Sequence, residues 1–249
     1  DPSPKSPPTA PVWAPPAAAA EAAVPGRHLR RVWALPMTRL GVVGWPAVLR
    51  DVLHVGWNYW WQAHLVDCLI DAELRDPRAD RRAATRRLLR GIRLRNQGRW
   101  LNIYYDDIAW LGLALHRARD IGVNRPGALR DILTRLRSGW SPDAGGGLWW
   151  RVGDNFKNTP ATGPAAILFA RLGTEAAERV KLGLRSELYR KMLRLGPSYA
   201  QRARTSDVVQ LTGEGVDQIQ SFFELFLPQL GFAILAPLTL FAAIAPLNM

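Results

Sequence analysis

Two adjacent carboxylates, Asp106 and Asp107, follow a pair of tyrosines in the middle of the chain. Two neighbouring carboxyl groups can divide the work of cleaving a glycosidic bond. One stays ionised and attacks the anomeric carbon, while the other, its pKa raised by desolvation and by the neighbouring charge, protonates the leaving oxygen. Consecutive side chains inside a helix diverge by about 100°. The pair can therefore converge on one substrate only at or just before a helix start, where the sequence predicts it.

The same position also has a purely structural interpretation. Asp is favoured at the N-cap and in the first turn of a helix, where it accepts backbone N–H bonds and meets the positive end of the dipole. The dipeptide alone therefore favours capping over catalysis. The aromatic residues near the pair favour catalysis, because sugar rings commonly stack on Trp and Tyr. The aromatic residues concerned, for each of which core packing is the alternative, are Trp60, Trp61, Tyr104, Tyr105, Trp110, Trp149 and Trp150.

Composition limits the class of protein. The chain has 249 residues, of which 48% are hydrophobic, and a formal net charge of +12. This suffices for a core of one large or two small domains. The arginines are spread through helical segments rather than clustered on one face, so we do not expect nucleic-acid binding. A single cysteine excludes an internal disulfide and a Cys-rich zinc site.

The hydrophobic pattern predicts an all-α fold of helical hairpins with short connections. Residues 1–26, rich in Pro and Ala, are expected to form a disordered leader. Prolines and glycines break up residues 27–55 into short helical turns and loops. Strand signals are almost absent. Apolar residues at helical spacing predict helices over residues 58–74, 79–94, 106–121, 126–136 and 161–172.

The character of the sequence changes after Gly173. Charged amphipathic helices are expected over residues 175–195 and 207–226. The uncharged apolar run 225–247 exceeds the roughly 20 residues that cross a bilayer, so we predict one transmembrane helix that contacts lipid, with a buried helical hairpin as the alternative. The chain would then be membrane-associated. Otherwise it would be secreted or cytoplasmic, with no signal peptide visible after Asp1.

Four motifs, in order, resemble those of the family 76 glycoside hydrolases, which are endo-acting α-1,6-mannanases with an (α/α)6 barrel. The resemblance covers about residues 27–173, roughly half of the family's barrel, and so implies a partial barrel. The motifs are Asn58-Tyr59-Trp60-Trp61-Gln62-Ala63, then Asn102 with Tyr104-Tyr105-Asp106-Asp107-Ile108-Ala109-Trp110, then Gly145-Gly146-Gly147-Leu148-Trp149, and then Lys157-Asn158.

This resemblance implies a retaining mechanism with Asp106 as nucleophile and Asp107 as general acid/base, α-mannan as substrate, and no metal or cofactor. Leu111 and Thr162 depart from the family pattern. The resemblance places Gln62, Asn102, Tyr105, Trp149, Lys157 and Asn158 along the cleft. Together with the aromatic residues Trp60, Trp61 and Trp110, these complete the predicted substrate-binding set.

The C-terminal part is similar to a different family, the transmembrane domain of ABC exporters implicated in thiol or cysteine export. The similarity covers about residues 185–248. Together with the Pro/Ala-rich leader and the glycoside hydrolase resemblance, it divides the chain at 1–26, 27–173 and 174–249. No Gly-x-x-x-x-Gly-Lys-Ser/Thr nucleotide loop is present, so a partner would have to supply the ATPase domains. The segments that carry the similarity are residues 195–199, 207–211, 214–218 and 227–230.

Three functional hypotheses follow. The first is a retaining glycosidase acting through Asp106 and Asp107. The second is the membrane component of an exporter. The third is a chimeric chain in which neither half works, because a half-barrel exposes an apolar face and would aggregate or form a homo-oligomer.

Overall fold

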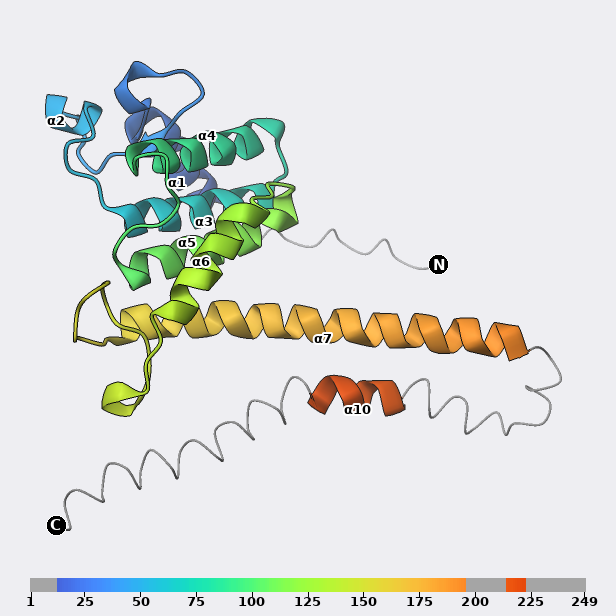
Figure 1. Cartoon of the computed structure of the whole chain (residues 1–249). Helices are drawn as coiled ribbons and strands as arrows, with labels where there is room; N and C mark the ends of the chain where they lie inside the picture. The colour runs from blue at the N-terminus through green and yellow to red at the C-terminus, as the bar shows by residue number, and fades with distance from the viewer. Residues whose placement is uncertain (1–12, 196–213, 223–249) are drawn as a thin grey trace, which may run out of the picture. The chain divides into compact units, whose positions relative to one another are not determined.

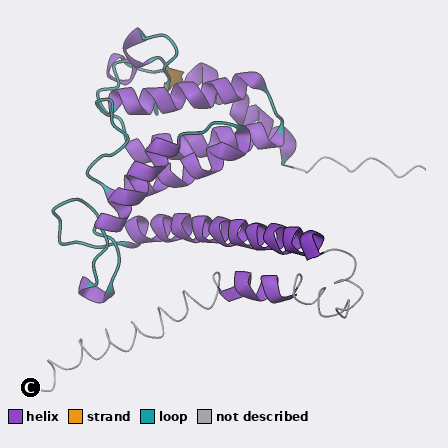
Figure 2. Cartoon of the chain, turned by 45° about the vertical axis from the view of Figure 1, so that its right-hand side comes forward, coloured by secondary structure: helices purple, strands orange, loops and turns teal. Residues whose placement is uncertain are grey.

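The computed structural model describes residues 13–195 and 214–222. The chain divides into two compact units. The first contains residues 13–140 and 148–165, and the second contains residues 141–147, 166–195 and 214–222. Helices dominate both units (Figure 2), which confirms the predicted all-α class.

Four helices form the centre of the first unit. Helix α3 packs against α4 and α5, and α5 packs against α6 (Figure 1). Their starts and ends agree with the predicted helices within one to three residues, and the last turn predicted for α5 is instead the short 3-10 helix η2. The bounds are Tyr59–Arg75 for α3, Ala79–Arg95 for α4, Tyr105–Ala118 for α5, Arg119–Ile121 for η2 and Pro126–Ser138 for α6.

The core of this unit consists of the apolar stripes of these helices. Ile92, Ile108, Leu111, Leu115 and Ile132 are each at most 1% exposed. Burying a side chain of this size stabilises a fold by about 1.5–3 kcal/mol. Short connections make successive helices run in opposite directions, so α3 and α5 begin at the same end of the unit (Figure 1).

The N-terminal segment differs from the expectation. Ala14–Arg27 is helix α1, where the sequence predicts a disordered leader. Pro15 and Pro16 occupy its first turn, where a missing N–H breaks no helical hydrogen bond, and the alanines that follow favour a helix. Glu21 forms salt bridges with Arg75 and Arg81, which attach α1 to α3 and α4. Residues 1–12 lie outside the described residues.

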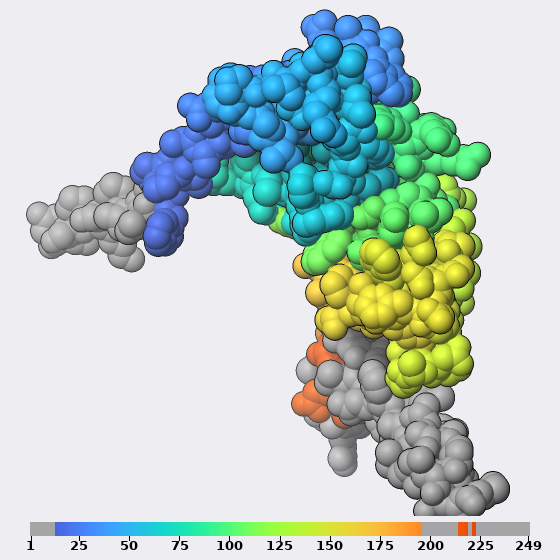
Figure 3. Space-filling model, turned by 90° about the vertical axis from the view of Figure 1, so that its left-hand side faces the viewer, coloured from blue at the N-terminus to red at the C-terminus, as the bar shows by residue number. Residues whose placement is uncertain are grey.

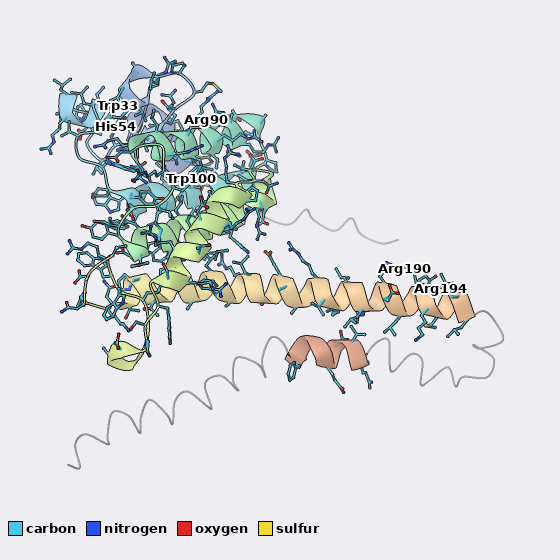
Figure 4. The ribbon with its side chains drawn as sticks, viewed as in Figure 1. Trp33, His54, Arg90, Trp100, Arg190 and Arg194 are labelled. Atoms are coloured by element: carbon cyan, nitrogen blue, oxygen red, sulfur yellow. The ribbon has the colours of Figure 1, made fainter. Side chains whose placement is uncertain are left out.

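Short elements connect α1 to α3. They are η1 (Val32–Ala34), α2 (Leu49–Val52) and two short strands, β1 (Leu29–Arg30) and β2 (Leu40–Gly41). The strands pair antiparallel, with Leu29 opposite Gly41 and Arg30 opposite Leu40. The sequence did not predict these strands, because two residues are too few to show alternation. The Trp33 indole donates to the Leu53 carbonyl at 3.1 Å, and Figure 4 shows Trp33 beside His54.

Strand β2 is held tightly against α3 and α4. The Gln62 amide of α3 accepts from the Gly41 N–H at 2.8 Å and donates to the Gly41 carbonyl at 2.9 Å. A Cβ at Gly91 of α4 would lie 1.9 Å from the Arg39 carbonyl oxygen. Glycine is therefore required at position 91 for the backbones to approach this closely.

The second unit contains η3 (Asp143–Gly145), α10 (Val216–Ser221) and most of helix α7 (Thr159–Leu195). The expectation of two helices separated near Gly173 is wrong, because α7 is continuous over 37 residues. A helix tolerates an isolated glycine at a cost of about 1 kcal/mol. Arg185 of α7 forms a salt bridge with Asp217 of α10 at 2.9 Å.

None of the helices in residues 13–195 and 214–222 is long and apolar enough to cross a bilayer. The apolar run 225–247 lies outside the described residues, so the transmembrane helix stays a prediction.

Replacing Gly91 by alanine should destabilise the first unit by about 3 kcal/mol, because the new Cβ collides with backbone rather than with a movable side chain. Gly127→Ala in α6 is the matched control, since no described atom lies within 4 Å of its Cβ. It should be neutral or stabilise by about 0.5–1 kcal/mol. Urea unfolding followed by circular dichroism measures both, and equal midpoints for the two variants would contradict the packing described.

Candidate active site

A cavity of about 390 Å³ lies where α3 and α5 begin. Figure 3 looks at this end of the first unit, with the start of α3 in cyan beside residues 96–107 in green. Three segments line the cavity: the start of α3, the loop between α4 and α5 with the first turn of α5, and Trp150. The lining residues are Trp57, Asn58, Tyr59, Trp60, Asn96, Asn102, Ile103, Tyr104, Asp106, Asp107 and Trp150.

Asp107 is the buried member of the carboxylate pair, with 7% of its surface exposed. Its carboxylate accepts a hydrogen bond from Asn102 Nδ2 at 2.5 Å and another from the backbone N–H of Trp60 in the first turn of α3. Burial raises the pKa of Asp107 to about 6; the Asn102 hydrogen bond opposes this rise, and the charge of Asp106 adds to it. A carboxyl with such a pKa can hold and release a proton near neutral pH.

Asn102 fixes the orientation of Asp107. Its Oδ1 accepts the Tyr104 N–H at 2.9 Å, so its Nδ2 is the atom turned toward the carboxylate. Both functions of the amide are therefore occupied. The structure makes Asn102 a residue that positions a carboxyl group, whereas the resemblance implied only that it lines the cleft.

Asp106 lies beside Asp107 and is more exposed. Its Oδ1 accepts the Asp107 N–H at 2.9 Å, and its Oδ2 accepts the Trp150 indole N–H at 3.1 Å. Two carboxyl groups side by side thus have different environments, which is the arrangement that separates an acid from a nucleophile.

Helix capping describes Asp106 in part, since its Oδ1 accepts the Asp107 N–H in the first turn of α5, but it does not account for Asp107. The N-cap of α5 is Tyr104, which makes no side-chain capping bond. The Asp107 carboxylate receives its hydrogen bonds from Asn102 and from α3 instead of from its own helix. A capping carboxylate would accept N–H groups of the helix it begins.

Trp150 reaches Asp106 because the loop after α6 pairs with the start of α5. The Tyr105 N–H donates to the Trp150 carbonyl at 2.9 Å, and the Val152 N–H donates to the Ile103 carbonyl at 2.8 Å. The Trp150 ring also lies 5.2 Å from the ring of Tyr104. The sequence predicts both Trp149 and Trp150 as candidate aromatic contacts for a sugar. It gives no reason to expect that Trp150, and not Trp149, contacts Asp106.

Of the predicted site residues, four line the cavity: Trp60, Asn102, Asp106 and Asp107. Trp60 is 43% exposed, and its ring meets those of Trp61 and His64 edge to face. The His64 ring lies 4.5 Å from that of Trp110. Trp61 and Trp110 therefore belong to an aromatic cluster connected to the cavity through Trp60, without lining it themselves.

The other predicted residues do not line this cavity, and each has a structural contact. Tyr105 is buried, with its ring against Gly139. Gln62 holds β2, as described above, and Asn158 Oδ1 accepts the Ala161 N–H at 3.0 Å near the start of α7. The Lys157 ammonium lies 4.5 Å from the centroid of the Trp149 ring. Their part in substrate binding stays a prediction.

Tyr59 also lines the cavity, and the sequence does not predict this role although Tyr59 lies within the first family 76 motif. Its hydroxyl donates to the Trp100 carbonyl at 2.5 Å. Burial, with a further contribution from the charge of Asp107, raises the pKa of Tyr59 well above its ordinary range. Four more lining residues could not be predicted from the sequence, because the cavity forms only where three separate chain segments come into contact. They are Trp57, Asn58, Asn96 and Ile103. In the described part of the chain, no three His, Cys, Asp or Glu side chains are placed to hold a metal ion.

The Asp107 carboxyl should titrate with a midpoint of about 6 when followed by ¹³C NMR. Asn102→Ala should move this midpoint upward, because it removes a hydrogen bond that favours the ionised form. Asn58→Ala is the matched control, since it lines the same cavity and makes no side-chain hydrogen bond to Asp107 among the described residues. An Asp107 titration midpoint near 4 would contradict the buried environment described, and so would equal midpoint shifts in Asn102→Ala and Asn58→Ala.

The same raised pKa has a consequence for stability. The folded state binds the Asp107 proton more tightly than the unfolded state does, so stability should fall as the pH rises from about 4 to about 6. Asp107→Asn should remove this fall and exceed the unchanged chain in stability at pH 7 by about 3 kcal/mol. Urea unfolding of the unchanged chain and of Asp107→Asn at pH 4 and at pH 7 tests this prediction. A stability difference between the two proteins that is the same at both pH values would contradict it.

Comparison with known proteins gives two family matches. Residues 37–179 match the sequence model of glycosyl hydrolase family 76, and residues 161–249 match the ABC transporter transmembrane region. The second match is accompanied by 43% identity over 67 residues to an uncharacterized ABC transporter ATP-binding protein of Haemophilus influenzae (27% of this chain and 12% of that protein).

The solved structures that resemble the chain include two with a TM-score above 0.5. One is an inactive variant, with two consecutive aspartates replaced by alanine, of the alpha-1,6-mannanase GH76A of Salegentibacter sp. HEL1_6 in complex with alpha-1,6-mannotetrose. It is 26% identical, with a TM-score of 0.56, over 65% of this chain and 45% of that one. The other is the Lin0763 protein from Listeria innocua, 25% identical, with a TM-score of 0.57, over 66% of this chain and 47% of that one.

The chain thus spans less than half the length of these solved structures. The match to the glycosyl hydrolase model, however, covers more than half of the chain and contains the whole carboxylate pair with its hydrogen-bonding partners. The chain therefore belongs to glycosyl hydrolase family 76.

Proposed function

We propose that the chain is a retaining α-1,6-mannanase-type hydrolase in which Asp106 is the nucleophile and Asp107 the general acid/base. One observation carries the proposal. A buried carboxyl whose pKa is raised to about 6 lies next to a carboxylate that accepts two hydrogen bonds, and both line one cavity.

The proposed reaction has two steps. The Asp106 carboxylate attacks the anomeric carbon while Asp107 gives its proton to the glycosidic oxygen, so the carbon–oxygen bond breaks and a glycosyl ester forms on Asp106. Asp107 then takes a proton from water, which attacks the anomeric carbon and releases the sugar with its original configuration. Asn102 and the Trp60 N–H keep Asp107 directed at the substrate, and Trp150 keeps Asp106 in place.

The substrate class rests on the comparisons and on the cleft. The Salegentibacter enzyme is inactive when two consecutive aspartates are replaced, and in that structure it holds alpha-1,6-mannotetrose. The cleft of this chain has consecutive aspartates between the aromatic rings of Trp57, Trp60 and Trp150, whose apolar faces can stack on sugar rings. An α-1,6-linked mannan or its oligosaccharides is therefore the substrate that we propose.

The hairpins α3–α4 and α5–α6 would form part of an (α/α)6 barrel in this proposal. The chain spans 45% and 47% of the two solved structures, which fits a partial barrel. We expect such a partial barrel to expose apolar surface and to self-associate.

Asp106→Asn and Asp107→Asn should each reduce the release of oligosaccharides from α-1,6-mannan by at least about 10²-fold, because each step needs both groups. Asp120→Asn is the matched control, being exposed and outside the cavity. The rate should fall as the pH rises above about 6, where Asp107 loses the proton that the leaving oxygen needs. Reducing-end assays measure these rates. Turnover by the unchanged chain no higher than that of the variant carrying both Asp106→Asn and Asp107→Asn would reject the proposal.

A second candidate function comes from the C-terminal match. We propose that residues 174–249 are a segment of an ABC-type transporter membrane domain, whose ATPase domains a partner would supply. The match over residues 161–249 and the Haemophilus influenzae relative support it. In this proposal the run 225–247 inserts into lipid and makes the chain membrane-associated.

The full chain should then remain in the membrane pellet after alkaline carbonate extraction. Replacing Ile234 and Leu235 by arginine should release it, because each arginine at the centre of a span costs about 2.5–3.5 kcal/mol. Recovery of the unchanged chain in the soluble fraction would argue against insertion.

A further inference from the structure

A second cavity, of about 590 Å³, adjoins the catalytic cleft within the first unit. The two cavities share Asn96, Asn102 and Ile103. Asn102 is also the residue that holds Asp107, so a ligand passing over it would extend from the cleavage site into the second cavity. The two cavities are therefore placed to take neighbouring parts of one molecule.

Arginine side chains make the lining of the second cavity basic. Arg93, Arg99 and Arg135 line it, against the single carboxylate of Asp131. Within residues 13–195 and 214–222, Arg99, Arg135 and Asp131 form no salt bridge. Three arginines thus line this cavity without a salt-bridge partner in the described part of the chain, which gives the cavity a positive potential.

A flat apolar surface lies among these arginines. Trp100, labelled in Figure 4, lines the cavity from the loop between α4 and α5, and the Arg93 guanidinium is 5.8 Å from its ring centroid. Arg93 Nε donates to the Gly98 carbonyl at 2.8 Å, which holds the guanidinium in this place. An indole face beside guanidinium groups suits a sugar ring that carries an acidic group.

The charges of the two cavities are opposite. The catalytic cleft contains two carboxyl groups and would repel an anion, whereas the second cavity would attract one. Guanidinium groups bind phosphate, sulfate and carboxylate through paired N–H donors.

We propose that the arginine-lined cavity binds an acidic substituent, a phosphate, sulfate or carboxylate group, on a saccharide whose neutral part occupies the catalytic cleft. This inference rests on the proposed function, because the cleft must accept the neutral part. It makes the enzyme selective for charged over neutral α-1,6-mannosides without adding a group to the reaction itself.

The test compares two ligands by calorimetry: α-1,6-mannotetraose, and the same tetraose carrying a phosphate monoester on its terminal C6 hydroxyl. The full chain with Asp106→Asn and Asp107→Asn is used, so that neither ligand is cleaved. The phosphorylated tetraose should bind about tenfold more tightly at low salt, and the advantage should shrink at high salt. Adding Arg99→Gln with Arg135→Gln should remove most of the advantage and leave the affinity for neutral tetraose unchanged.

Arg130→Gln is the matched control, since it lies on α6, is exposed and does not line the cavity. It should leave the advantage intact. Equal affinities for the two tetraoses, or an advantage that survives the two arginine substitutions, would overturn this inference while leaving the proposed hydrolase untouched. Tight binding of inorganic phosphate alone, with no gain from attachment to the sugar, would also overturn it. If neither tetraose binds, the proposed substrate fails and this inference fails with it.

Discussion

The burial of Asp107 is the constraint on which the rest of the site depends. A carboxylate removed from water is costly unless hydrogen bonds or opposite charges compensate it. Here Asn102 and the Trp60 N–H compensate in part, and the remaining cost appears as a raised pKa. The same burial that destabilises the ionised form gives the protein a proton to donate near neutral pH.

This environment requires α3 and α5 to begin at the same end of the unit. The up-and-down order of α3, α4 and α5 provides that arrangement, and the apolar stripes that include Ile92, Ile108 and Leu111 hold it. Fixing β2 between α3 and α4, through Gln62 and Gly91, further restrains the helix that supplies the Trp60 N–H. Packing far from the cleft thus sets the geometry of the acid.

The sequence predicted what depends on local pattern. Apolar spacing located α3, α4, α5 and α6, and the adjacency of Asp106 and Asp107 to a helix start located the pair. It could not predict features that depend on meetings between distant segments. Trp150 enters the site only because its loop pairs with residues 103–105, and Tyr105 is buried by a close contact with Gly139. Helix α7 continues through Gly173 because no local signal there is strong enough to end it.

The junction between the two family matches lies inside one helix. The glycosyl hydrolase match ends at residue 179 and the transporter match begins at residue 161, so both include the first half of α7. A helix is a junction that leaves no unpaired backbone groups, since each N–H finds its carbonyl four residues earlier. Such a chain can carry a complete carboxylate pair while spanning less than half the length of the mannanase it resembles.

The anomeric configuration of the first product tests the central claim most directly. Proton NMR of freshly cleaved α-1,6-mannotetraose, recorded before mutarotation, distinguishes the two anomers. A covalent ester on Asp106, formed while Asp107 donates its proton, requires the α anomer to appear first. Initial formation of the β anomer, or no product above the background of the variant lacking both aspartates, would contradict the assignment of Asp106 as nucleophile and Asp107 as acid.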